Sequence, residues 1–184
     1  MDTLRRKIVF ALPLAVPLAV PRSAGADPAV VSPASGMSGA NFSVVGSVKN
    51  ALDRSPESLR KSELVRELAP IALTSCTGEF KRMLAGYRGL KLTDLLDQAQ
   101  FDARSHNDLK RMYVLAKAKD GYSVVFSWTE LYNTPVGQSV FVLVDKDGTQ
   151  LPEAEGPLVL VSASDLRTGP RHVRWLTSLE VARA

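Results

Sequence analysis

The chain has 184 residues, of which 45% are hydrophobic, and its 23 basic and 19 acidic side chains give a formal net charge of +4. Length and composition of this kind predict one globular domain of ordinary size. The positive excess lies in residues 1–26, which hold four basic side chains and one acidic one. Because the rest of the chain is nearly neutral, it lacks the basic surface that nucleic-acid binding requires, and we expect no nucleic-acid partner.

Residues 1–26 have the pattern of a cleaved export signal peptide. Arg5, Arg6 and Lys7 precede an apolar stretch over residues 8–20, and Ala24-Gly25-Ala26 offers a small-residue cleavage site. Two prolines interrupt the apolar stretch, which is also too short for a comfortable membrane span. We therefore predict a product that is exported to the periplasm or secreted.

The paired arginines leave two export routes open. Arg5-Arg6-Lys7-Ile8-Val9 matches a twin-arginine pattern, and Arg22 places a positive charge just before the cleavage site, as is common in twin-arginine leaders. Leu4 stands where a polar residue is more usual. An ordinary secretory leader therefore remains the alternative.

The first half of the chain predicts both helices and strands. Residues 27–41 are rich in Pro, Ser, Gly and Ala and predict a flexible lead-in to a domain over residues 42–184. A first strand is expected over residues 42–48. Ser55-Pro56-Glu57 is a helix-start signal, and this helix should extend to about Leu68. We then expect a buried strand over residues 71–76, a loop to Leu90, and a helix through Ala99.

The second half is mostly β-structure by its apolar pattern. Residues 112–118 and 122–127 flank Asp120-Gly121 and predict a hairpin. Residues 129–132 fit one helical turn, residues 140–144 a central strand, and residues 158–161 a further strand. Alternation over residues 173–181 predicts a half-buried final strand, with Trp175 facing the core. The expected class is a mixed, strand-rich α+β domain.

Several familiar site patterns are incomplete. Asp145-Lys146-Asp147-Gly148 opens like a calcium loop, but it lacks the later glycine and the bidentate acid, so we interpret it as a hairpin turn. His106 and His172 have no second histidine or cysteine at zinc spacing, and we expect surface or structural roles for both. Ser58 and Lys61 match a nucleophile pattern but fall on a charged helix face.

Cys76 is the only cysteine of the chain. A lone thiol forms no internal disulfide, so in an exported protein it needs another explanation. Two interpretations are open from the residue alone. Cys76 is either an inert, buried small hydrophobe or a soft thiolate that binds a ligand.

Short motifs follow one another through the whole of residues 42–184. They are Phe42-Ser-Val-Val-Gly46, Leu73-Thr-Ser-Cys76-Thr-Gly78, Tyr87-Arg-Gly89-Leu-Lys-Leu92, Asp120-Gly121-Tyr122, Asp147-Gly148-Thr149, Glu155-Gly156-Pro157-Leu158 and Val173-Arg174-Trp175-Leu176. This ordered set resembles the sulfite-oxidase-type molybdopterin-binding domain. The resemblance implies the fold of that domain and a molybdopterin-molybdenum cofactor.

The resemblance also implies roles for particular residues. Cys76 takes the position of the family's thiolate ligand to molybdenum. The pterin dithiolene supplies two further sulfurs, so the protein need give only one soft anionic sulfur. Positive charge beside the cofactor would come from Lys81, Arg82, Arg88 and Arg174. No catalytic residue is assigned.

The function implied by the resemblance is that of a periplasmic molybdopterin-dependent oxidoreductase, or its cofactor-binding subunit. Such a protein transfers oxygen atoms or electrons on a small-molecule substrate, with a periplasmic or membrane electron-transfer partner. The chain departs from the family where Gly78-Glu79-Phe80-Lys81 replaces a Gly-Asn-Arg pattern, and where Val159 replaces an arginine. It also lacks the long insertions that wrap the pterin. The alternative is a cofactor-free module that keeps the fold and binds a small ligand or a partner.

Overall fold

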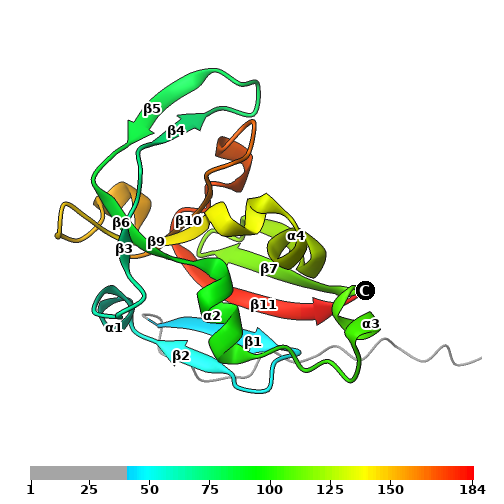
Figure 1. Cartoon of the computed structure of the whole chain (residues 1–184). Coiled ribbons are helices and arrows are strands. Elements are labelled where there is room, and N and C mark those ends of the chain that lie inside the picture. Colours follow the sequence, from blue (N-terminus) through cyan, green and yellow to red (C-terminus); the bar gives the residue numbers. More distant parts are fainter. Residues whose placement is uncertain (1–40) are drawn as a thin grey trace, which may run out of the picture. The chain divides into compact units, whose positions relative to one another are not determined.

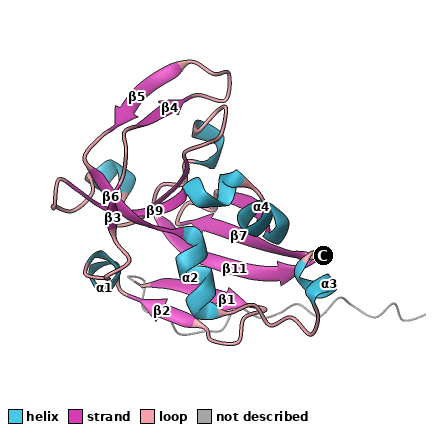
Figure 2. Cartoon of the chain, viewed as in Figure 1, coloured by secondary structure: helices cyan, strands magenta, loops and turns pink. Residues whose placement is uncertain are grey.

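The computed structural model describes residues 41–184. The predicted signal peptide over residues 1–26 and all but the last residue of the lead-in lie outside the described residues, and both stay predictions. Within the described part, strands dominate and short helices connect them (Figure 2). No helix of residues 41–184 combines the length and apolar character needed to cross a membrane.

Five strands form the larger sheet, in the order β2-β1-β11-β7-β8 (Figure 1). Neighbouring strands are antiparallel except for β1 and β11, which are parallel. The bounds are β1 Phe42–Gly46, β2 Leu52–Arg54, β7 Met112–Ala118, β8 Ser123–Ser127 and β11 Leu176–Arg183. The predicted first strand and the predicted β7–β8 hairpin are thereby confirmed.

A second, antiparallel sheet has the order β10-β9-β6-β3, and β4 and β5 form a separate hairpin. Strand β9 lies inside its sheet, as its apolar sequence predicted. The bounds are β3 Arg66–Glu67, β4 Ile71–Thr74, β5 Phe80–Leu84, β6 Tyr87–Lys91, β9 Val140–Lys146 and β10 Val159–Ser162.

The helices are short and are placed at the connections between strands. The helical turn expected over residues 129–132 begins one residue earlier, at Trp128, and Ser127 caps it, because its hydroxyl oxygen accepts a hydrogen bond from the N–H of Glu130 (3.0 Å). The α-helices are α1 Pro56–Arg60, α2 Leu92–Ala99, α3 His106–Leu109 and α4 Trp128–Asn133, and the 3₁₀ segments are η1 Pro135–Ser139, η2 Glu153–Glu155 and η3 Gly169–Arg171. Helix α2 confirms the prediction made for residues 93–99.

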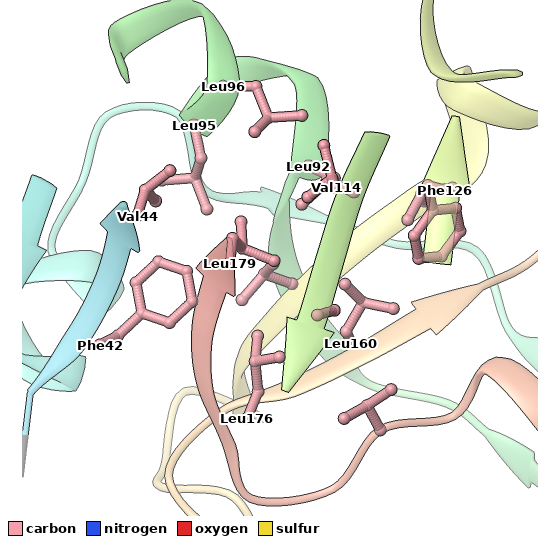
Figure 3. Packing of buried hydrophobic residues seen from close by; sticks show 14 of the residues in the cluster. Phe42, Val44, Leu92, Leu95, Leu96, Val114, Phe126, Leu160, Leu176 and Leu179 are labelled. Carbon is pink, nitrogen blue, oxygen red and sulfur yellow. The ribbon is translucent and has the colours of Figure 1, made fainter. Parts of the chain in front are cut away.

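The main core lies between the larger sheet on one side and α2 with the smaller sheet on the other, and Leu160 of β10 is part of it (Figure 3). Leu95 and Leu96 of α2 meet Val44 of β1 and Leu179 of β11, and each of the four is at most 2% exposed. A second cluster joins the base of the β4–β5 hairpin to the smaller sheet. Its members are Leu68, Ile71, Leu73, Leu84, Tyr87, Leu143, Leu151, Val159 and Val161. This second cluster fixes the hairpin to the rest of the domain.

Two predictions about the first half are wrong. The helix that begins at Pro56 ends at Arg60 instead of Leu68, because Leu64 and Val65 pack on the main core while Leu68 packs on the second cluster. One extended segment thus connects the two cores. The predicted loop to Leu90 contains β5 and β6. Four exposed residues precede Leu84 in β5. The sequence of this strand shows no apolar alternation from which it could have been predicted.

The predicted position of Trp175 is also wrong. Trp175 precedes β11 with a backbone φ of +52°, and its side chain is 37% exposed. Positive φ is unfavourable for a residue with a β-carbon and breaks the strand alternation at this point. As a result Val173 and Leu176 are buried, whereas Trp175 turns outward.

Candidate functional site

Cys76 lies in the turn that joins β4 to β5. Backbone hydrogen bonds from Ser75 N to Glu79 O (2.8 Å) and from Gly78 N to Ser75 O (3.0 Å) close the turn. The Ser75 hydroxyl oxygen also accepts from the N–H groups of Thr77 and Glu79, at 3.3 and 3.1 Å. The Cys76 side chain is exposed. The interpretation of Cys76 as a buried small hydrophobe is therefore wrong, and its thiol is accessible to a ligand.

The hairpin is held by the segment that precedes β11, over residues 165–172. Buried Thr168 is the main link, because its hydroxyl accepts from Thr74 N (2.9 Å) and donates to Ala72 O (2.8 Å). Thr168 N donates in return to Thr74 Oγ1 (3.1 Å). Arg167 Nη1 donates to the Cys76 carbonyl at 2.7 Å. These bonds fix the backbone on both sides of the cysteine.

Glycine is required where this segment meets the hairpin. A β-carbon on Gly169 would lie 2.1 Å from the carbonyl oxygen of Thr74, a distance that two such atoms cannot adopt. The η3 segment therefore approaches the hairpin closely, as Figure 1 shows below the β4–β5 turn. Arg171 bonds to Asp165 within the same segment (Nε–Oδ2, 2.6 Å) and anchors the segment to α4 through Glu130 (Nη1–Oε1, 2.6 Å).

A basic pocket of about 340 Å³ opens between the hairpin and the η3 segment. Three of the predicted cofactor-binding residues line it together. Lys81 and Arg82 come from β5, and Arg174 follows η3 in the chain. The full lining is Leu73, Thr74, Lys81, Arg82, Gly169, His172 and Arg174. Cys76 is not part of this wall; it lies two residues beyond Thr74 in the chain, in the turn of the hairpin.

The basic side chains of the pocket differ in their ion pairs. Lys81 pairs with Glu79 (Nζ–Oε2, 2.7 Å), and both side chains are largely exposed. Arg82 pairs with Glu155, whose side chain is 3% exposed. Arg174 has no ion pair with any described residue. The pocket thus contains one guanidinium whose charge is not offset.

Glu155 is a buried carboxylate that receives two donors. Besides Arg82, the Tyr87 hydroxyl lies 3.2 and 3.1 Å from the two carboxylate oxygens. Burial, and next the negative charge of Glu155, raise the pKa of Tyr87, so Tyr87 keeps its proton and donates. The pairing holds Arg82 against the pocket wall.

His172 is a pocket residue that the sequence analysis did not select. Its Nε2 atom is buried and has no hydrogen-bond partner among the described residues. Burial lowers the pKa of His172 to about 4, so the imidazole is neutral near pH 7. The sequence offered one hint that His172 lies beside Arg174, because residues 172 and 174 point to the same side of an extended segment.

The partly buried imidazole of His172, with its buried Nε2 atom, predicts a specific loss of stability in acid. The unfolded His172 titrates near its ordinary pKa of 6.5 and the folded one near 4, so between these values only the unfolded chain gains this proton. Stability should therefore be unaffected above pH 7 and fall as the pH drops through this window, by about 2 kcal/mol at pH 5. Urea unfolding of the protein and of the His172→Gln variant, each at about pH 7 and about pH 5, measures how much stability each loses in acid. Identical pH dependence in the two proteins would contradict the prediction.

Arg88 lies apart from this pocket. It is in β6 and forms three hydrogen bonds with Asp145 of β9, including Nε–Oδ1 at 2.9 Å and Nη2–Oδ2 at 2.5 Å. The side chain of Asp145 is completely buried. Arg88 thus balances a buried carboxylate inside the smaller sheet, and it is not among the residues that line the pocket near Cys76. In residues 41–184 no cluster of three or more His, Cys, Asp or Glu side chains is arranged to hold a metal ion.

A comparison with solved structures finds a protein of similar fold. The chain is similar to the sulfane dehydrogenase SoxCD from Paracoccus pantotrophus, with a TM-score of 0.52 and 17% sequence identity. The match covers 77% of this chain and 38% of that one, so the chain spans less than half of the length of its structural neighbour. No protein-family model matches the sequence. No curated protein matches it either.

The architecture and the structural neighbour together define the class of the domain. It is a mixed, strand-rich α+β domain, as the sequence predicted, and its fold is similar to that of part of the sulfane dehydrogenase SoxCD. At 17% identity the likeness establishes the fold alone.

Proposed function

We propose that the chain is the cofactor-binding domain of an exported, molybdopterin-dependent oxidoreductase. In this proposal Cys76 is the thiolate ligand to molybdenum, and the basic pocket holds anionic groups of the pterin. The single observation that carries it is the exposed Cys76 thiol in the turn of a hairpin whose strands also line a basic pocket, with Lys81 and Arg82 among the lining residues. A small-molecule substrate and an electron-transfer partner in the periplasm or its membrane complete the proposal.

The residues present fit such a group in charge and in ligand type. A thiolate is a soft ligand suited to molybdenum, and the exposed position of Cys76 leaves room for a metal beside it. Arg174 offers a guanidinium whose planar fork pairs well with a phosphate. His172 also lines this pocket.

The protein would contribute orientation and charge. The bound cofactor would supply the oxygen-atom or electron transfer. Arg167, which donates to the Cys76 carbonyl, fixes the turn and with it the direction of the cysteine. Glu155 and Tyr87 keep Arg82 at the pocket wall. Because the imidazole of His172 is neutral near pH 7, it adds no charge to the pocket.

Metal analysis tests this proposal most directly. The full chain, with its own leader, is produced in a host that makes molybdopterin and in a matched host that cannot. We expect about one molybdenum atom per chain and a visible absorption band only from the first host, with the protein in the periplasmic fraction. Purified, folded protein without molybdenum from both hosts would refute the proposal.

The charge balance of the pocket favours a second candidate function. Glu79 and Glu155 offset Lys81 and Arg82, which leaves Arg174 to meet an anion. This arrangement suits one small oxyanion, as expected for a cofactor-free binding module. Calorimetric titration with sulfate would then show saturable binding to metal-free protein. Arg174→Ala should remove this binding, while Arg88→Lys, which is outside the pocket, should retain it.

A further inference from the structure

A second cavity, of about 410 Å³, lies on another part of the domain between α1, β9 and the segment around η2. It shares no lining residue with the basic pocket near Cys76. Its volume falls within the range of about 300–1,000 Å³ that is usual for small-molecule sites. Val144 and Leu151 give it an apolar floor, and they are 3% and 7% exposed.

Trp175 forms one wall of this cavity in an unusual conformation. Its φ of +52° is held by two backbone hydrogen bonds, from Trp175 N to Glu155 O (2.8 Å) and from Lys119 N to Trp175 O (3.0 Å). The indole packs so closely on Gly156 that a β-carbon there would lie 2.5 Å from ring atom Cδ2. The backbone and Gly156 therefore fix the ring in one position.

The exposure of this ring points to a binding role. A tryptophan that served only to fill the core would be covered, yet Trp175 is 37% exposed. Unfavourable backbone conformations that are held firmly by their surroundings cluster at binding and active sites. The Lys119 ammonium lies over the ring, 5.0 Å from its centroid. The part of the fixed ring that remains exposed, beside an apolar floor, offers contact area to a flat or branched apolar body with little loss of conformational entropy.

The rim of the cavity carries charges of both signs. Arg60 of α1 and Glu153 of η2 line it, and neither has an ion pair with any described residue. Glu57 also lines the rim, and its carboxylate is bonded to Lys61 (2.7 Å). The carboxylates of Glu57 and Glu153 would repel a simple anion, and Arg60 would repel a simple cation. A molecule with one group of each sign can pair with charges of both kinds.

We propose that this cavity binds a small zwitterion with an apolar body, of the class of the aromatic and large aliphatic α-amino acids. The apolar body lies against Trp175, the ligand carboxylate meets Arg60, and its ammonium group meets Glu153. The proposal does not depend on a molybdenum cofactor. Binding should therefore be the same in metal-free protein and in the Cys76→Ser variant.

Trp175 itself provides the measurement, because the chain has only two tryptophans. Trp128→Phe leaves Trp175 as the sole indole and keeps an aromatic ring stacked on Tyr132. Titration of this variant with phenylalanine or leucine should change the Trp175 emission saturably, with a Kd between about 10 µM and 1 mM for so small a ligand. Calorimetry on the unsubstituted chain gives an independent value. No saturable signal by either method up to about 10 mM of both amino acids would overturn the proposal.

Matched variants and ligands test the two charged contacts. Arg60→Ala should weaken phenylalanine binding at least about tenfold, the loss expected for one charge-assisted hydrogen bond. Arg104→Ala removes an exposed arginine outside the cavity and should have no effect. Phenylethylamine lacks the carboxylate and 3-phenylpropionate lacks the ammonium group, so each should bind at least about tenfold more weakly than phenylalanine. Equal binding by either analogue, or by Arg60→Ala, would overturn the assignment of a zwitterion.

Discussion

Replacing Arg82 with alanine should lower the free energy of unfolding by about 3 kcal/mol. The reason is Glu155, whose side chain is 3% exposed and is paired with Arg82. Without Arg82, the Tyr87 hydroxyl is the one side-chain donor that this buried carboxylate keeps among residues 41–184. Removing one partner of a buried pair costs about 3–5 kcal/mol. The lower end applies because the Arg82 side chain is itself 45% exposed. Urea unfolding at pH 7.5 measures the change.

Arg174→Ala is the matched control for Arg82. Arg174 lines the same pocket but has no ion pair with a described residue, so its removal should change stability by less than about 0.5 kcal/mol. The double variant Arg82→Ala/Glu155→Gln should regain part of the loss, since the unpaired charge is then gone. Equal stability losses in Arg82→Ala and Arg174→Ala would contradict the structural role of the Arg82 pair.

Much of the fold could be predicted because its strands have clear apolar patterns. Strands β7 and β8 alternate about an Asp-Gly turn, and β9 is apolar on both faces. The failures have physical causes. Strand β5 is largely exposed and its apolar residues do not alternate, since among the described strands it pairs with β4 alone. Strand β6 contains Gly89, where the smaller sheet leaves no room for a side chain: a β-carbon would lie 2.5 Å from the carbonyl oxygen of Val142. A glycine there suggests a loop to a reader of the sequence alone.

The sequence predicted which residues line the candidate site better than it predicted which residues they pair with. The resemblance selected Lys81, Arg82 and Arg174, and the structure brings these three to one pocket. It also selected Arg88, which is engaged with buried Asp145 inside a sheet. Such pairings depend on contacts between residues far apart in the chain, and no local pattern reveals them. The outward turn of Trp175 follows in the same way from hydrogen bonds to residues 119 and 155.

Substituting Cys76 with serine should remove the metal signature of the domain while leaving its stability almost unchanged. Cys76 is exposed and the change is close to isosteric, so the free energy of unfolding should shift by less than about 0.5 kcal/mol. If its sulfur binds molybdenum, protein from a molybdopterin-competent host should lose the thiolate-to-metal absorption band. Thr77→Ala, an exposed change in the same turn, should retain the band.

The same thiol can be followed chemically, without knowledge of the substrate. In cofactor-free protein an aromatic disulfide reagent should modify one thiol per chain, because the chain has one cysteine and its side chain is exposed. In molybdenum-loaded protein a thiolate bound to the metal is no longer a free nucleophile, so modification should slow at least about tenfold. Equal modification rates in loaded and cofactor-free protein would show that the sulfur is not a metal ligand. The cofactor-free binding module would then be the better account of this domain, since its oxyanion site requires Arg174 and makes no use of Cys76.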